Sequence, residues 1–182
     1  MRNILKEIIP YIIIFIIVVL IRTFIITPVT VVGSSMYPTL KNKELLLLSK
    51  ISYKIEEIER FDVVVIKEDE YIKKRVIGLP GEDVSYKDNN LYINDKLVED
   101  KYAMGETEDF TLEDIWLAGT HNKYIENFEE PFTKIPEGYY LVLGDNRGIS
   151  KDSRSVGLIN EDEIKGKAVV RFWPLKKISL VK

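Results

Sequence analysis

The first thirty residues carry the longest apolar run of the chain. Ile8 to Ile21 contains no charged residue, and Phe24 to Ile26 extends the apolar character after Arg22 and Thr23. The first run alone is short for a bilayer, but the two runs together reach the roughly 20 residues that a spanning helix needs. Arg22 would then extend its charge to the lipid headgroups. The pattern therefore predicts an N-terminal transmembrane helix.

A cleavable signal peptide is the alternative interpretation of this segment, with Arg2 and Lys6 as its charged region. No small-x-small cleavage site follows the apolar run, which favours a retained anchor. Arg2 and Lys6 place the N-terminus in the cytoplasm by the positive-inside rule, although Arg22 weakens the charge bias. We expect residues 1–27 to form a cytoplasmic tip and a single-pass anchor in the cell membrane, and residues 28–182 to form an extracytoplasmic domain.

The rest of the chain consists of short apolar segments of strand length. Four consecutive leucines within Glu44 to Ser49 predict a strand that is buried on both faces. Val63 to Ile66 and Tyr71 to Ile77 flank the polar stretch from Lys67 to Glu70, which predicts a hairpin. Further strands are predicted at Thr30–Val32, Val84–Lys87, Leu91–Ile93, Lys96–Val98 and Tyr139–Leu143, and a last one at Ala168–Phe172, which Pro174 stops. The domain is therefore predicted to be mainly β.

An acidic segment interrupts this pattern between Glu99 and Glu130. Its acids greatly outnumber its bases, and its apolar residues show no sustained period, which predicts a solvated loop or a small inserted subdomain within residues 83–133. Calcium loops need oxygen ligands at alternate positions and a glycine at the turn, and Glu106 to Asp109 lacks that pattern. We predict no metal site there.

Composition narrows the class of protein. About 150 residues would remain beyond the anchor, which is enough for one domain with a substantial core. The net charge of −3, with no basic stripe, argues against a nucleic-acid partner. The absence of cysteine excludes disulfides and thiolate metal sites, and it leaves the compartment undecided.

Candidate chemistry begins at Gly33 to Leu40, where Ser34 and Ser35 precede a turn that contains Pro38. A serine hydroxyl is a poor nucleophile unless a neighbouring base removes its proton. The only histidine, His121, lies in the acidic segment and is predicted to be a surface residue. A Ser-Lys arrangement is the remaining route, and the residues alone do not separate Ser34 from Ser35.

Two adjacent lysines, Lys73 and Lys74, lie in the second strand of the predicted hairpin. Side chains alternate between faces along a strand, so Lys74 shares its face with Ile72 and Val76. A free lysine has a pKa near ~10.4, whereas a general base that acts at neutral pH needs a pKa of ~7 to 8. Burial lowers the pKa of a lysine because it disfavours the charged ammonium form. Lys74 is therefore the candidate base, unless its stem is buried and its ammonium reaches water. Lys73 is expected to lie on a wet surface.

Four ordered motifs resemble those of the type I signal peptidases, the membrane-bound serine proteases that remove signal peptides. The motifs are Ser34–Leu40, Arg60–Val65, Tyr71–Gly81, and Gly144–Arg147 with Ser150, Asp152, Ser153 and Arg154. The resemblance implies a partly open, β-barrel-like catalytic domain with a less regular insert. It also implies a Ser-Lys dyad, with preprotein signal peptides and membrane lipid as partners and with no cofactor.

The resemblance assigns roles residue by residue. Ser35 resembles the nucleophile because it directly precedes Met36, and Lys74 resembles the base because it directly precedes Arg75. Ser150 resembles the hydroxyl that orients the lysine amine. Asp145 resembles a structural acid that pairs with Arg75, although a turn role for this aspartate is equally open.

Gly33 departs from the pattern of those signal peptidases that carry a serine two positions before the nucleophile. The oxyanion would then rely on backbone groups of Gly33 and Ser35. Cleavage after small-x-small sites implies an extended substrate strand that is added to a sheet edge. Apolar residues are expected to hold this edge close to the lipid: Val31, Val32, Phe172 and Trp173.

Two alternatives stay open at this point. One is a dedicated Ser-Lys processing protease with a narrow substrate such as a pilin. The other is a membrane-tethered β-module that binds an envelope ligand without chemistry.

Overall fold

An open eight-stranded sheet forms the centre of the computed structural model. The structure describes residues 2–51, 57–67, 71–119 and 130–181, and it describes the side chains of all of these except residues 2–6 and 24. The helices are α1 (Arg2–Leu20), the π-helical η1 (Ile21–Ile25), α3 (Leu112–Gly119), α4 (Ser153–Val156), and the 3-10 turns η2 (Glu161–Glu163) and η3 (Leu175–Lys177). The strands are β1 (Ile26–Thr30), β2 (Leu45–Ser49), β3 (Val63–Lys67), β4 (Tyr71–Gly78), β5 (Val84–Lys87), β6 (Asn90–Ile93), β7 (Lys96–Val98), β8 (Tyr139–Leu143), β9 (Ile159–Asn160), β10 (Ile164–Trp173) and β11 (Ser179–Leu180).

The large sheet runs in the order β1-β2-β10-β3-β4-β8-β9, with β11 attached to β10, and all its neighbours are antiparallel. Among the described strands, β1 pairs only with β2 and β9 only with β8, so the path has two ends. Buried side chains from both faces fill two clusters, one around Leu46, Leu48 and Val65 and the other around Val64 and Val142. The prediction of a mainly β domain is confirmed.

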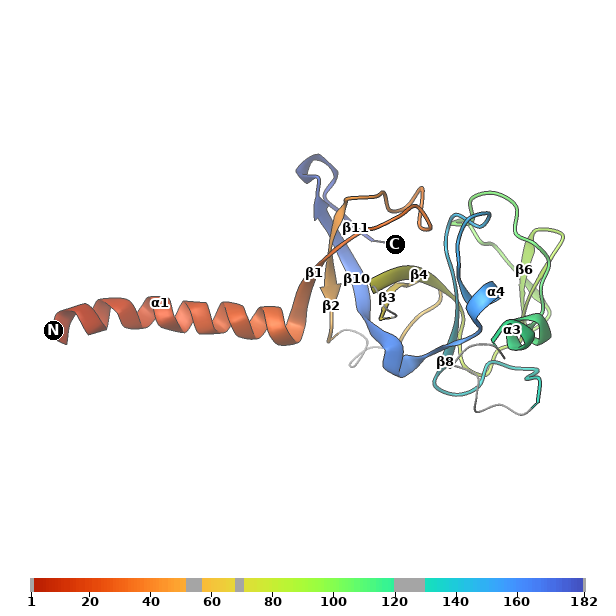
Figure 1. The fold of residues 1–182 in the computed structure, drawn as a ribbon, viewed down its shortest axis with the longest axis horizontal. Helices are drawn as coiled ribbons and strands as arrows, with labels where there is room; N and C mark the ends of the chain where they lie inside the picture. Colours follow the sequence, from red (N-terminus) through yellow and green to blue (C-terminus); the bar gives the residue numbers. More distant parts are fainter. Residues whose placement is uncertain (1, 52–56, 68–70, 120–129, 182) are drawn as a thin grey trace.

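Helix α1 projects away from the strands (Figure 1), and η1 continues it directly into β1. Its large apolar side chains from Ile8 to Leu20 are each 44–73% exposed. Within the part of the chain whose side chains are described, no helix combines the length and the apolar content of a membrane span. The predictions for the side chains of Arg2 and Lys6 lie outside the described residues, as do those for His121 and the hairpin loop 68–70.

Most predicted strands are present, and the errors lie at their ends. The strand that was expected at Thr30 to Val32 begins earlier, because Ile26 to Thr30 already pairs with β2. β10 is longer than predicted, and Pro174 does not end the sheet because β11 returns to pair with β10. Leu46 and Leu48 are buried, whereas the alternate leucines of β2 are only half-buried.

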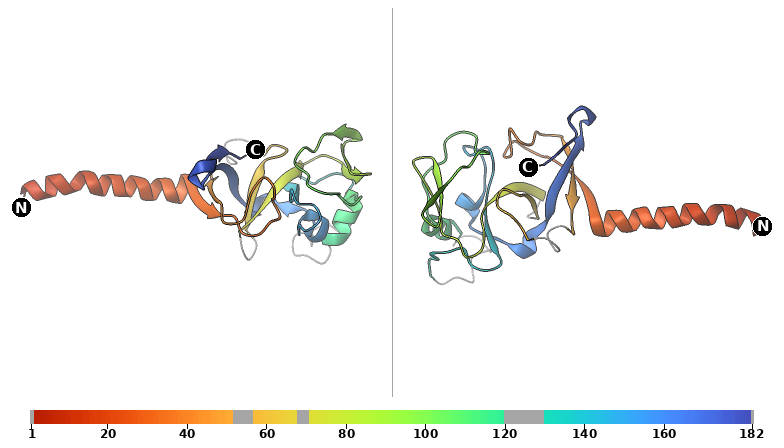
Figure 2. Two further views of the ribbon diagram at one scale, coloured as in Figure 1. Left: turned by 90° about the horizontal axis from the view of Figure 1, so that it is seen from above. Right: turned by 180° about the vertical axis from the view of Figure 1, so that it is seen from behind.

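The second, three-stranded sheet β5-β6-β7 lies with α3 at the end of the domain opposite α1 (Figure 2). Its predicted strands are confirmed, but the prediction of an irregular acidic segment missed α3. This helix buries Leu112 and Ile115 against Tyr86, Phe110 and the end of β8. A short helix with two apolar anchors gives too weak a periodicity to be distinguished from a loop.

A buried polar network holds this second sheet to the turn that follows β8. Arg147 is 2% exposed; its Nη1 donates to Tyr86 Oη at 2.6 Å and to Thr107 Oγ1 at 3.0 Å, and its Nε donates to the Gly144 carbonyl at 3.0 Å. Its Nη2 forms an ion pair with Asp100. Burial raises the pKa of Asp100, but the Arg147 charge and the hydrogen bonds from Tyr86 and Arg147 outweigh it, so the pKa lies below its usual value.

This network makes stability dependent on pH. We expect Asp100→Asn to cost roughly 3–5 kcal/mol at pH 7, because it leaves the Arg147 charge buried without its partner. The folded pKa of Asp100 lies below the unfolded value of about 3.9, so the stabilisation is present above that value and is lost as the pH falls through the folded pKa. Thermal unfolding between pH 7 and pH 2.5 should show the gap between parent and variant closing below about pH 4.

The matched control is Asp95→Asn, a change of the same chemistry at an exposed turn residue of the same subdomain. It should leave the melting temperature nearly unchanged at every pH. A gap between parent and Asp100→Asn that stays constant down to pH 2.5 would contradict the assigned linkage.

Candidate active site

The segment from Gly33 to Leu40 forms a tight turn directly after β1. The Tyr37 amide donates to the Ser34 carbonyl at 3.1 Å, and the Leu40 amide donates to the Met36 carbonyl at 2.8 Å. Met36 and Leu40 are buried and pack with the leucines of β2, so the turn is fixed to the core by its apolar members. Ser34 is exposed and Ser35 is half-buried. The packing thus presents Ser35 at the edge of the core and Ser34 to solvent.

Gly33 begins this turn with a φ of 84°, in the left-handed region that a side chain disfavours. Its amide donates to Asn42 Oδ1 at 3.2 Å. Val31, two residues before Gly33, is buried in the core near β2, so the expectation that Val31 holds a sheet edge close to the lipid is wrong.

Lys74 lies in the middle of β4, opposite Val64 of β3, and is only 4% exposed. Its predicted burial on the face of Ile72 and Val76 is confirmed. Its Nζ contacts Ser150 Oγ at 2.8 Å, a hydrogen bond that joins residues 76 positions apart. The Lys74 nitrogen is therefore buried with the rest of the side chain, which argues against the alternative in which the stem is buried and the ammonium reaches water.

Lys73 differs from its prediction. It is 5% exposed, and its Nζ donates to the Thr30 carbonyl at 2.8 Å and to the Tyr71 carbonyl at 2.7 Å. The expectation of a wet surface is wrong because the second face of β4 is also covered. Alternation along a strand shows which side chains share a face, but it does not show whether the second face of the strand is covered by other parts of the protein.

Arg75 and Asp145 form a fully buried ion pair. Arg75 Nε and Nη2 lie 2.7 Å from Asp145 Oδ1 and Oδ2, and Nη1 donates to the Phe61 carbonyl at 2.7 Å. The guanidinium also stacks over the Tyr102 ring at 3.6 Å. Thr39 Oγ1 donates to Asp145 Oδ2, which connects the Gly33–Leu40 turn to the same pair. A bidentate pair with its remaining groups satisfied is the arrangement in which two buried charges are tolerated.

The loop from Gly144 to Ser153 brings these elements together. The Asn146 amide donates to the Ser35 carbonyl at 2.9 Å, so the loop is bonded directly to the Gly33–Leu40 turn. Asp152 is 1% exposed and accepts from the Gly144 amide at 2.9 Å. Ser153 Oγ accepts from the Val142 amide at 3.0 Å. These two side chains at the start of α4 therefore fix the end of β8 and hold Ser150 over Lys74.

Gly144 lies where the backbone of Ser35 and the side chain of Ser150 come close to each other. A Cβ at this position would lie 2.1 Å from Ser150 Oγ and 2.6 Å from the Ser35 carbonyl oxygen. No side chain fits between the hydroxyl that contacts Lys74 and the backbone of Ser35. This glycine is required for space rather than for an unusual φ.

Several residues that contact the site had no role assigned to them from the sequence. Thr39 and Asn146 lie within two of the sequence motifs but had no assigned role, and Tyr102 stacks on Arg75 from the acidic segment, which carries no local signal of the site. Asp152 could have been recognised as an N-cap, since it precedes α4 and accepts from the Arg154 amide. Among the described residues, no group of three His, Cys, Asp or Glu side chains has the arrangement of a metal site.

Comparison with known proteins identifies the family to which these motifs are similar. The family model described as signal peptidase, peptidase S26, matches residues 3–173. Signal peptidase IB of Staphylococcus aureus (strain COL) is 42% identical over 180 residues, which cover 97% of this chain and 93% of that protein. Signal peptidase I of Bacillus caldolyticus is 37% identical over 182 residues, covering 93% of this chain and 92% of that protein.

A solved structure is also similar. The crystal structure of a signal peptidase I from Enterococcus faecalis V583 is 34% identical in sequence and aligns with a TM-score of 0.49, covering 62% of this chain and 97% of that one.

The close approach at Gly144 gives a test of the site geometry. We expect Gly144→Ala to lower kcat/KM for peptide cleavage about 100-fold, the loss that a displacement of about 1 Å causes at a catalytic site. The physical reason is that the new methyl group must displace Ser150 or the Ser35 backbone. Steady-state cleavage of a short peptide measures the effect.

Gly148→Ala is the control, because a Cβ at Gly148 in the same loop meets no atom within 4 Å. It should keep parental activity. Equal activity of Gly144→Ala and Gly148→Ala would show that the loop adjusts without cost and would contradict the assigned constraint.

Proposed function

The chain belongs to the signal peptidase family, peptidase S26, and we propose that it removes N-terminal signal peptides from exported preproteins with Ser35 as nucleophile and Lys74 as general base. The observation that carries this assignment is the 2.8 Å contact between Lys74 Nζ and Ser150 Oγ, at a buried position beside the Ser35 turn. Membership of a peptidase family argues against the non-catalytic envelope-binding module.

The reaction proposed is acyl transfer through a covalent intermediate. Neutral Lys74 accepts the proton of the Ser35 hydroxyl, and Ser35 attacks the scissile carbonyl. Lys74 then protonates the leaving amine, and water hydrolyses the ester between Ser35 and the signal peptide. Ser150 acts by orienting the lysine amine. Burial of Lys74 supports this role, because removal from water disfavours the ammonium form and favours the base.

The buried pair of Arg75 and Asp145 has a structural role in this proposal. Arg75 directly follows the base, and Asp145 directly follows Gly144, so the pair fixes β4 relative to the loop that carries Ser150. Thr39 extends this connection to the nucleophile turn. The oxyanion is assigned to the backbone of Ser35 and the Gly33 region, because Gly33 provides no hydroxyl.

Substrate would bind as an extended strand. β1 pairs only with β2 among the described strands, and the Tyr71–Lys74 half of β4 pairs only with β3. The unpaired edge of β1 lies just before Ser35 in the chain, and the unpaired edge of β4 contains Lys74. A strand added between the two edges would therefore bring its scissile bond to both side chains. Small residues before the cleavage site would suit this position.

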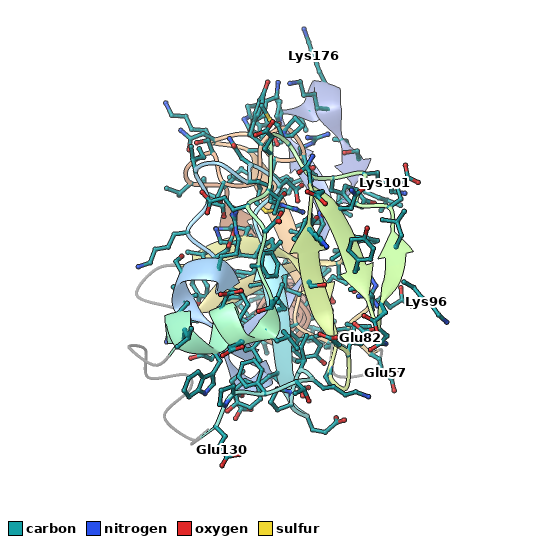
Figure 3. The ribbon with its side chains drawn as sticks, turned by 90° about the vertical axis from the view of Figure 1, so that its right-hand side faces the viewer. Glu57, Glu82, Lys96, Lys101, Glu130 and Lys176 are labelled. Carbon is teal, nitrogen blue, oxygen red and sulfur yellow. The ribbon has the colours of Figure 1, made fainter. Side chains whose placement is uncertain are left out.

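Residues 1–27 are assigned as cytoplasmic tip and membrane anchor, residues 28–182 as the extracytoplasmic catalytic domain, and residues 83–133 as its inserted subdomain. The exposed apolar side chains of α1 support the anchor, because nothing in the domain covers the described ones. The turn η3 and the residues that flank it add exposed Trp173, Leu175 and Ile178, and Lys176 projects from the tip of the turn (Figure 3). Aromatic, aliphatic and basic side chains together suit a lipid interface.

The dyad assignment is tested by four variants assayed on a peptide with a small-x-small site. Ser35→Ala and Lys74→Ala should lose at least 1,000-fold in kcat, the order expected when a nucleophile or its base is removed. Ser34→Ala should stay within about three-fold of the parent, because Ser34 is exposed. Lys74→Arg should not restore activity, since a guanidinium cannot accept the proton. Full activity of Ser35→Ala would refute the proposal.

The anchor assignment is tested by removing residues 1–25, which leaves β1 complete and able to pair with β2. The shortened protein should cleave a soluble peptide at a rate close to that of the full chain. Its processing of a preprotein in vesicles should fall at least ten-fold, because the anchor concentrates enzyme and signal peptide at one surface. Equal losses in both assays would mean that α1 contributes to the catalytic fold instead.

A further inference from the structure

The buried ammonium of Lys73 lies at the edge where the substrate strand would bind. It reaches the carbonyl of Thr30, the last residue of β1, at 2.8 Å and that of Tyr71, the first residue of β4, at 2.7 Å. Thr30 and Tyr71 are themselves exposed, so a buried cation joins the carbonyls of two exposed backbone positions. This contact is distinct from the Lys74 site, because adjacent side chains leave a strand on opposite faces.

Hydrogen-bond alternation shows the direction of the Thr30 carbonyl. Val31 donates its amide to Glu44 at 2.8 Å and accepts from the Lys43 amide at 2.9 Å, so its backbone groups face the chain that leads into β2. Backbone groups alternate in direction along a strand. The Thr30 carbonyl therefore points away from β2, into the unpaired edge.

The same reasoning applies to β4. The Val76 amide donates to Asp62 at 2.9 Å and its carbonyl accepts from Phe61 at 2.8 Å, which places its backbone groups on the side of β3. β3 and β4 pair without a register shift from Val63 to Lys67. Lys73 and Tyr71 are an odd number of residues from Val76, so their carbonyls point away from β3. Lys73 thus bonds one outward-facing carbonyl on each unpaired edge.

We propose that Lys73 is a latch on the substrate-binding edge, a specificity-determining residue that occupies two backbone acceptors which the substrate strand must take over. The proposal rests on the function proposed above, in which the substrate adds to these edges. An added strand gains its affinity from main-chain hydrogen bonds to such carbonyls. The bound ammonium has to leave before the amides of the substrate can donate to them. Lysine at an exposed edge also prevents non-specific strand pairing, so the latch would admit only peptides that bind well enough to displace it.

Substrate affinity measured apart from catalysis tests the latch. In full-length protein carrying Ser35→Ala, the dissociation constant of a fluorescent peptide with a small-x-small site is measured by anisotropy in detergent. Adding Lys73→Met, which keeps the length of the side chain and removes its donors, should lower the dissociation constant about ten-fold. Lys73→Arg keeps the donors and should stay within about two-fold of the Ser35→Ala protein. Lys67→Met is the control, because Lys67 is exposed and lies opposite Tyr71 on β3.

An unchanged or higher dissociation constant in Lys73→Met, with a melting temperature close to that of the parent, would overturn the latch. A failure to bind the peptide both with and without Lys73→Met in the Ser35→Ala protein would also overturn it. In otherwise unchanged enzyme, Lys73→Met should lower KM and leave kcat the same, whereas a fall in kcat would mean that Lys73 positions Lys74 instead. Cleavage that survives Ser35→Ala would refute the proposed function, while the order of dissociation constants would still decide the latch.

Discussion

The buried ion pair between Arg75 and Asp145 is the interaction on which the rest of the site depends. Both side chains are fully excluded from water, so each charge is tolerable only while the other is held in bidentate contact. Arg75 follows Lys74 on β4, and Asp145 begins the loop that carries Ser150. Thr39 brings the turn of Ser35 to the same carboxylate. One electrostatic requirement therefore fixes three distant segments in one arrangement.

Around this pair, the loop after β8 is held by hydrogen bonds that involve its backbone groups. Asp152 and Ser153 accept from amides of the strand end, and Asn146 donates to the carbonyl of Ser35. Gly144 leaves the space in which Ser150 and Ser35 approach each other. Arg147 connects the same loop to the second sheet, because it donates both to the Gly144 carbonyl and to Tyr86 of β5.

Local patterning determined much of the fold. Alternating and continuous apolar segments predicted the hairpin of β3 and β4, the leucine strand β2 and the meander of the second sheet, because these strands are short and bounded by turn residues. Alternation also identified Lys74 as the buried lysine of the face that contains Val76. The motifs around Ser35 and Gly144 indicated the family, since their order along the chain is itself informative.

Only the tertiary structure decided which of these residues meet and what covers them. The sequence predicted the face of Lys73 but not its burial, because its partner Thr30 in β1 lies 43 positions away along the chain. Local pattern carries no information on such contacts. It also missed α3, whose stability comes from packing against Tyr86 and Phe110 rather than from its own periodicity. The sequence thus determined most of the strands and the candidate chemistry, and long-range packing alone decided the geometry that brings them together.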